Sequence, residues 1–260
     1  MYVAEISLAV ESDYPVEKAV EMLVWLTNTF RMNGQMQGRE NPIAEQDGFY
    51  RTFLMTPARD SLDARYANKW VNHVLERFHT EGLPAPVLSV LGKDPGSMEE
   101  CGCAERSSFI LYTDYLCLES SLRCGDCFGP VPLYSIPATY DEEFYDLICW
   151  QSDYQACDQL QMNCRTGEQF GLRELSRHDS NLSRQGREVC KKIEAGTELP
   201  VFYYLHRYRG RSRQVELARR CPECGGEWPL ETRLHDLFDF QCHPCRLLSN
   251  IAFHVPERQV

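Results

Sequence analysis

The sequence predicts an α+β protein built from an N-terminal βαβαβ layer, a cysteine-bearing hairpin, a helical segment and a C-terminal ribbon that again carries cysteines. Two observations predict this class. The N-terminal third contains segments in which apolar residues alternate at strand period and others in which they recur at helix period. Beyond it, closely spaced cysteines occur on either side of a helical pattern. These changes predict four parts, at residues 1–97, 98–138, 139–199 and 200–260.

The N-terminal part alternates strands with helices. We expect a strand, a helix, a strand, a helix and a strand at residues 1–10, 16–30, 49–55, 62–79 and 87–91. Ser12 and Asp13 are placed to cap the first helix, and Gly82 is placed to end the second. This order predicts helices packed on a small sheet, with a ferredoxin-like arrangement as one option, because strand order cannot be derived from the sequence.

The middle part carries two cysteine motifs. Cys101-Gly102-Cys103 and Cys124-Gly125-Asp126-Cys127 are separated by twenty residues, and residues 109–118 between them have the composition of a strand. Four thiols placed this way predict a Cys₄ zinc site on a hairpin. Cys117 is an alternative ligand, and a cluster of free thiols is the competing interpretation. The spacing does not match the common iron–sulfur ligand patterns.

Helical signals follow this hairpin. Thr139 is placed to cap a helix over residues 140–160, and residues 141–143 put three acidic side chains in its first turn. A second helix is expected from 181 or 183 to 193, and a strand at 200–205. Cysteines in this part are expected to be core residues, because no histidine lies near enough in the sequence to activate a thiol.

The strongest motif lies near the C-terminus. Cys221-Pro222-Glu223-Cys224 is followed after seventeen residues by Cys242-His243-Pro244-Cys245. Two residues between cysteines let both sulfurs of a turn face a point about 2.3 Å away, the Zn–S distance of a tetrahedral site. Gly225 and Gly226 permit the positive φ that such a turn requires. A redox dithiol is the alternative, but no thioredoxin-like context surrounds either pair. Four thiolates leave no open coordination position, so we expect a structural zinc.

Composition and charge limit the classes of protein. The chain has 260 residues, a net charge of −11 and thirteen cysteines. An odd number of cysteines, four of them at zinc spacing, favours a reducing cytoplasm over a disulfide framework. The first ten residues lack a basic leader, and no apolar stretch approaches the about 20 residues of a membrane helix. We therefore expect a soluble cytoplasmic protein without membrane contact.

One segment is basic in this acidic chain. Residues 184–220 contain ten Lys or Arg and four Glu, a local charge of +6 that leaves −17 for the remainder. Arg207, Arg209, Arg211 and Arg213 alternate with residues that include Tyr208. Basic and aromatic side chains in this pattern are typical of surfaces that follow phosphates and stack on bases. The alternative is that these arginines pair with the chain's own carboxylates or with an acidic partner protein.

Several C-terminal motifs resemble those of a known family. They include Cys221-Pro222-x-Cys224-Gly225-Gly226-x-Trp228 and Phe238-Asp239-Phe240-x-Cys242-x-x-Cys245, within a span from 186 to 252. Residues 2–6 and 101–137 show the similarity more weakly. The family consists of uncharacterised bacterial proteins described as zinc-ribbon-containing, with a suggested role in nucleic-acid binding. The resemblance implies a bacterial cytoplasmic source and zinc at the four C-terminal cysteines, and it supplies no activity.

Three functions are compatible with these observations. The first is a non-enzymatic module that docks on RNA, DNA or a nucleoprotein through the basic segment and the ribbon. The second is an immunity-type protein that binds and inhibits a bacterial toxin enzyme, since an acidic surface associates quickly with a basic one. The third is an enzyme, but no catalytic triad, phosphate loop or open zinc site is present in the sequence. We therefore expect no catalytic residues, no small-molecule substrate, and a macromolecular partner.

Overall fold

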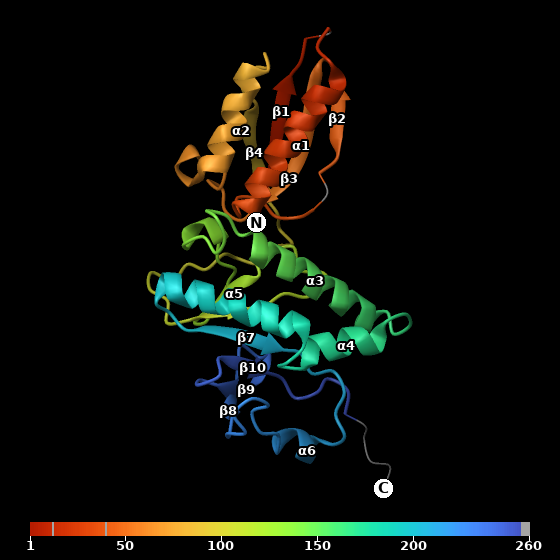
Figure 1. Cartoon of the computed structure of the whole chain (residues 1–260), viewed down its shortest axis with the longest axis vertical. Helices are drawn as coiled ribbons and strands as arrows, with labels where there is room; N and C mark the ends of the chain where they lie inside the picture. Colours follow the sequence, from red (N-terminus) through yellow and green to blue (C-terminus); the bar gives the residue numbers. More distant parts are fainter. Residues whose placement is uncertain (12, 40, 256–260) are drawn as a thin grey trace. The chain divides into compact units, whose positions relative to one another are not determined.

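The computed structural model describes residues 1–11, 13–39 and 41–255, which form two compact units (Figure 1). The first unit comprises residues 1–102, 118–120 and 129–145, and the second comprises 103–117, 121–128 and the chain from 146 onward. Together they make a mixed α+β protein with two sheets.

The first unit is organised on a four-stranded sheet of order β2-β3-β1-β4 in which every pair is antiparallel. Its elements are β1 (Tyr2–Ala9), α1 (Val16–Met32), β2 (Ile43–Gln46), β3 (Phe49–Thr56), α2 (Lys69–Thr80) and β4 (Val87–Lys93). The three predicted strands and two predicted helices are present, and β2 was missed. This strand has four residues, of which only Ile43 is even half-buried, so it carries no alternating pattern.

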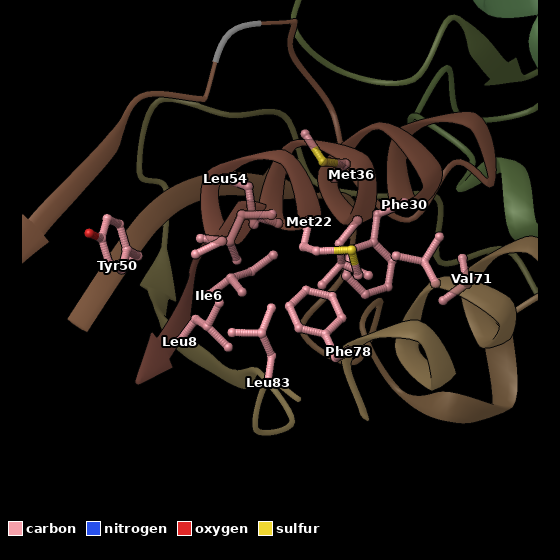
Figure 2. Close-up of a cluster of buried hydrophobic side chains, with 14 of the residues drawn as sticks. Ile6, Leu8, Met22, Phe30, Met36, Tyr50, Leu54, Val71, Phe78 and Leu83 are labelled. Carbon is pink, nitrogen blue, oxygen red and sulfur yellow. The ribbon is translucent and has the colours of Figure 1, made fainter. Parts of the chain in front are cut away.

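The core of this unit lies between one face of the sheet and the two helices. Figure 2 shows Ile6 and Leu8 from β1 meeting Met22 and Phe30 from α1 and Phe78 from α2. Side chains at every second position of β1 are buried, as the alternation predicted. Burial of each of these apolar side chains stabilises the fold by roughly 1.5–3 kcal/mol relative to leaving it exposed to water.

The two helices of this unit begin differently from the prediction. Pro15 holds the N-cap position of α1, whereas Ser12, an expected cap, lies outside the described residues. The helix expected over 62–79 begins only at Lys69, after a short 3₁₀ turn at Ala64–Tyr66. Asn68 sets this start, because its side chain accepts hydrogen bonds from the backbone N–H of Trp70 at 3.1 Å and of Val71 at 2.9 Å.

Replacing Asn68 with Ala is expected to lower the free energy of unfolding by about 1 kcal/mol, because two N–H groups at the start of α2 lose their acceptor. Urea denaturation followed by circular dichroism measures this change. Asn68→Asp is the matched control, since aspartate keeps the acceptor and should retain most of the stability. Equal losses in both variants would instead assign the effect to the amide, which also donates to the carbonyl of Glu142 at 2.8 Å.

The second unit is built on a six-stranded sheet of order β6-β5-β7-β10-β9-β8. Pairs β5–β7 and β7–β10 are parallel and the other pairs are antiparallel. Its strands are β5 (Phe109–Leu111), β6 (Leu122–Cys124), β7 (Val201–Leu205), β8 (Pro229–Leu234), β9 (Phe238–Cys242) and β10 (Leu247–Ser249). The middle hairpin and the C-terminal ribbon therefore belong to one continuous sheet.

The helices of the second unit are α3 (Tyr145–Met162), α4 (Glu168–Ser176), α5 (Asn181–Thr197) and the short α6 (Arg213–Leu217). Of these, α5 packs against the central strand β7, and Figure 1 shows the two side by side. All five residues of β7 are buried. The side chain of Trp150 in α3 lies on Tyr203 of this strand, with ring centroids 5.9 Å apart.

Several element boundaries in this unit differ from the prediction. The strand expected over 109–118 ends at Leu111, and α4 was missed. The helix expected from Tyr140 begins at Tyr145, because Asp141 and Glu142 adopt positive φ values of 41° and 63°. The helix expected to end before Gly196 continues to Thr197.

Candidate metal centres

The C-terminal cysteines form one closed cluster. The sulfur atoms of Cys221, Cys224, Cys242 and Cys245 all lie within 4.8 Å of one another. Those of Cys224 and Cys242 are 3.7 Å apart. A tetrahedron with Zn–S bonds of about 2.3 Å has S···S edges of about 3.8 Å, so the four sulfurs are spaced for one such ion.

The backbone at the first pair of cysteines makes a tight turn, with the predicted positive φ at Gly225 but not at Gly226. The N–H of Gly225 donates to the carbonyl of Cys221 at 2.9 Å, and the N–H of Cys221 donates to the carbonyl of Gly226 at 2.9 Å. Gly225 has a φ of 71°, a conformation that glycine adopts without steric cost. This turn points both sulfurs toward the second pair.

The turn at the second pair closes without a glycine. Arg246 follows the last cysteine and takes a φ of 53°. Its guanidinium is held by Glu194 at 3.0 Å and by the carbonyl of His243 at 2.6 Å. These charge-assisted hydrogen bonds offset the cost of the left-handed conformation. The sequence carries no signal for this pairing, because Glu194 lies 52 residues away.

Hydrogen bonds also favour the anionic form of one thiol in this cluster. Hydrogen bonds, of which the largest contribution is from the backbone N–H of Gly226 and the next from the thiol of Cys245, lower the pKa of Cys224 to about 7. Burial acts in the opposite sense on Cys242 and raises its pKa. A bound cation would stabilise both thiolates, which is the form that binds metal.

A second cluster contains the cysteines of the middle part. The sulfurs of Cys101, Cys103, Cys124 and Cys127 lie within 4.8 Å of one another. Cys124 ends β6, and its sulfur accepts from the N–H of Asp126 at 3.4 Å. Cys117, the alternative ligand, is not in this group, and its sulfur lies 2.8 Å from the guanidinium of Arg123.

Each of the two clusters can hold one metal ion. All thirteen cysteines have free thiols, and eight of them belong to the two groups. Sulfur ligands favour soft and borderline ions such as Zn²⁺ and iron in iron–sulfur centres. The eight residues predicted as ligands are thus brought together in the two sets that the sequence spacing indicated.

The predicted basic segment is partly neutralised by the chain itself. Arg207 donates to Glu216 through Nε at 3.2 Å and through Nη2 at 2.9 Å, and Glu216 is fully buried. Arg209 pairs with Glu168 at 2.5 Å. Arg211 and Arg213 are exposed, and within the described residues neither forms an ion pair. Of these four arginines, Arg211 and Arg213 therefore remain available to an external anion.

Tyr208 and its neighbours form a small aromatic group. Tyr208 is half-buried and stacks on His206 with ring planes 10° apart. His206 also contacts Phe253, with ring centroids 5.5 Å apart, and its pKa is lowered by burial. Tyr208 is thus packed against the protein, and part of its ring is no longer free for stacking on a base.

Some residues that shape this region were not singled out from the sequence. Asn250 accepts hydrogen bonds from the hydroxyl of Tyr204 and from the N–H of Arg207, both at 2.9 Å, and donates to the carbonyl of Arg207 at 2.8 Å. Glu216 binds two arginines from a buried position. Their only sequence signal is proximity to the ribbon, which does not distinguish them from surface residues.

These features define an α+β protein that carries two Cys₄ clusters. The chain belongs to the bacterial family of an uncharacterised protein of Haemophilus influenzae (strain ATCC 51907 / DSM 11121 / KW20 / Rd), with which it is 37% identical over 243 residues, or 92% of this chain and 93% of that protein. A second uncharacterised protein of that strain is 43% identical over 145 residues, or 56% of this chain and 71% of its own length.

Three family models match successive parts of the chain. Each is described as a domain of unknown function: DUF8589 over residues 1–92, DUF2310 over 103–206 and DUF8594 over 210–255. A solved structure described as a "putative antibiotic biosynthesis monooxygenase" from Deinococcus radiodurans covers 39% of this chain and 100% of its own, with a TM-score of 0.27 and 12% identity. Among the described residues, no helix combines the length and apolarity needed to cross a bilayer.

Proposed function

We propose that both clusters bind Zn²⁺ and that the metal has a structural role. The support is the ligand set: four sulfurs around one point occupy every position of a tetrahedral ion and leave none for water or substrate. The C-terminal cluster would then be the zinc ribbon that its sequence predicts. The free thiols also favour a reducing compartment, and we place the protein in the cytoplasm.

We propose a ferredoxin-like arrangement for the first unit. It is supported by the element order β1-α1-β2-β3-α2-β4 and by the strand order β2-β3-β1-β4 with all pairs antiparallel. Ferredoxin-like units serve many unrelated functions, so this assignment indicates architecture and no activity.

We propose that the protein is a non-enzymatic module that docks on a nucleic acid through its second unit. The observation that carries the proposal is the pair of exposed cations Arg211 and Arg213, which form no ion pair within the described part of the chain and lie shortly before the ribbon in the basic span 184–220. The rest of the chain carries a charge of −17, given the overall −11 and the local +6. An acidic protein would therefore present its partner with a restricted basic surface.

The salt dependence of binding tests this function. Fluorescence anisotropy of a labelled single-stranded RNA or DNA should show a dissociation constant that rises steeply with salt. A plot of the logarithm of the dissociation constant against the logarithm of the salt concentration gives a positive slope. In the double variant R211Q/R213Q this slope should be smaller by about 1.4, at about 0.7 for each lost phosphate contact. The matched control is R59Q/R165Q, which removes two exposed arginines elsewhere and should leave the slope unchanged.

Two outcomes would contradict the proposal. If both double variants changed the salt dependence equally, binding would depend on the net charge of the protein and not on a specific surface. Indifference to nucleic acid, together with a tight one-to-one complex with the product of a neighbouring gene, would favour an immunity-type protein instead.

A further inference from the structure

A small cavity in the second unit lies beside the C-terminal cluster. Its volume is about 250 Å³, and its lining includes Arg207, Arg219, Arg220, His206 and Ser249. Among residues 1–11, 13–39 and 41–255, no aspartate or glutamate lines it. We call this cavity, defined by its three arginines, the arginine pocket. Cavities for drug-sized ligands measure about 300–1,000 Å³, so this one suits a compact group.

A buried carboxylate beneath the pocket holds two of these arginines in place. Glu216 is fully buried; it binds Arg207 through two hydrogen bonds and lies 3.2 Å from Nε of Arg219. Arg219 also donates through Nη2 to the carbonyl of Asn250 at 2.8 Å and lies over the ring of Phe240 at 4.5 Å. The Nη1 group of each guanidinium stays outside this set of contacts. The guanidinium groups of Arg207 and Arg219 are therefore held in position before a ligand binds.

The charges around the pocket leave a positive excess. Arg207 and Arg219 share one carboxylate, which leaves one positive charge between them. Arg220 pairs with Glu227, but the two side chains are 57% and 79% exposed. Ion pairs this exposed contribute little and exchange readily with solvent, so Arg220 can turn toward an anion.

We propose that the arginine pocket binds a phosphate group, either one in a nucleic-acid backbone or one in a small phosphate ester. Arginine forks match phosphate oxygens in a bidentate geometry, and a cavity without carboxylates does not repel them. The inference deepens the proposed function, because it names the chemical group that the second unit recognises. It also differs in location, since Arg219 and Arg220 lie six or more residues beyond Arg211 and Arg213, the two arginines on which the docking proposal rests.

Isothermal titration of the zinc-loaded full chain tests the pocket. Inorganic phosphate, pyrophosphate and a twelve-residue single-stranded oligothymidylate serve as probes, in a phosphate-free buffer at constant ionic strength. Pyrophosphate should bind with one-to-one stoichiometry, and R220Q should weaken it about tenfold by removing a charge-assisted contact. R207K should also weaken binding, because lysine keeps the charge but not the fork.

Two controls separate a specific effect from a general one. R165Q removes an exposed arginine of the same unit outside the pocket and should leave the affinity unchanged. R211Q/R213Q should likewise leave pyrophosphate binding intact. Zinc content and the thermal midpoint of each variant report whether it is folded.

The results distinguish this inference from the proposed function. Binding of pyrophosphate without binding of the oligonucleotide would support the pocket and overturn nucleic-acid docking. Binding of the oligonucleotide that R220Q and R207K leave unchanged in folded protein would overturn the pocket and keep docking. Absence of binding by every phosphate probe, or an equal loss in R165Q, would overturn the pocket.

Discussion

Replacing Cys242 with Ser is expected to remove one metal ion per chain and to unfold the C-terminal ribbon. Cys242 ends β9 and is 3% exposed, so the substitution replaces one of the four sulfur ligands at a buried position. Structural zinc sites contribute roughly 10–16 kcal/mol of apparent binding free energy, and a site with three thiolates loses much of it. Whole domains are stable by only about 5–15 kcal/mol, so the ribbon should not stay folded without the ion.

The loss should spread beyond the ribbon because the sheet is continuous. β9 pairs with β10, and β10 pairs with the central strand β7 through Leu248 and Tyr204. Elemental analysis should give one zinc per chain in place of two, and thermal unfolding should begin at a lower temperature. The matched control is Cys164→Ser, an exposed thiol outside both clusters, which should keep two ions. Two ions retained in Cys242→Ser would contradict a Cys₄ site.

The clusters could be predicted from the sequence because ligand spacing is a local property. Two residues between Cys221 and Cys224 fix the geometry of one turn whatever the rest of the fold does. The same holds for strands with a regular alternation, such as β1, whose buried positions are those that the pattern indicated. Patterns of this kind can be interpreted from the sequence because the residues that form them lie within one short segment.

Short strands and helix starts could not be predicted in the same way. The strands β5, β6 and β10 have three residues each, too few to show any period. The acidic residues after Thr139 favour a helix start, yet Asp141 and Glu142 adopt the left-handed conformation and Thr139 instead donates its N–H to the carbonyl of Glu143. Tertiary contacts override local propensity at such positions.

Charge pairing was the least predictable feature of the candidate site. Arg209 forms an ion pair with Glu168, which lies 41 positions away in the chain. Arg207 forms an ion pair with Glu216, which is buried although glutamate is usually exposed. Nucleic-acid contact and internal pairing were both open for Arg207, Arg209, Arg211 and Arg213, and the structure gives internal partners to the first two of these four. Only the fold brings these charges together.

Replacing Gly186 with Ala is expected to destabilise the second unit through a clash in its core. Gly186 lies in α5 where this helix packs against β7. A Cβ atom at this position would lie 2.2 Å from Cε2 of Tyr203 and 2.5 Å from Nε1 of Trp150. Both rings are at most 1% exposed, so neither can move aside without disturbing its neighbours. Overpacking of this kind costs about 1–3 kcal/mol or more, which exceeds the gain in helix propensity.

The matched control lies in the same helix. Gly196 is exposed, so Gly196→Ala adds a methyl group toward solvent and should raise the free energy of unfolding by up to about 1 kcal/mol. In urea denaturation of zinc-saturated protein, the unfolding midpoint should therefore fall for Gly186→Ala and rise for Gly196→Ala. Increases of similar size in the free energy of unfolding of both variants would show that α5 and β7 are not in close contact at Gly186. Opposite shifts would support the close approach of helix and strand on which the second unit depends.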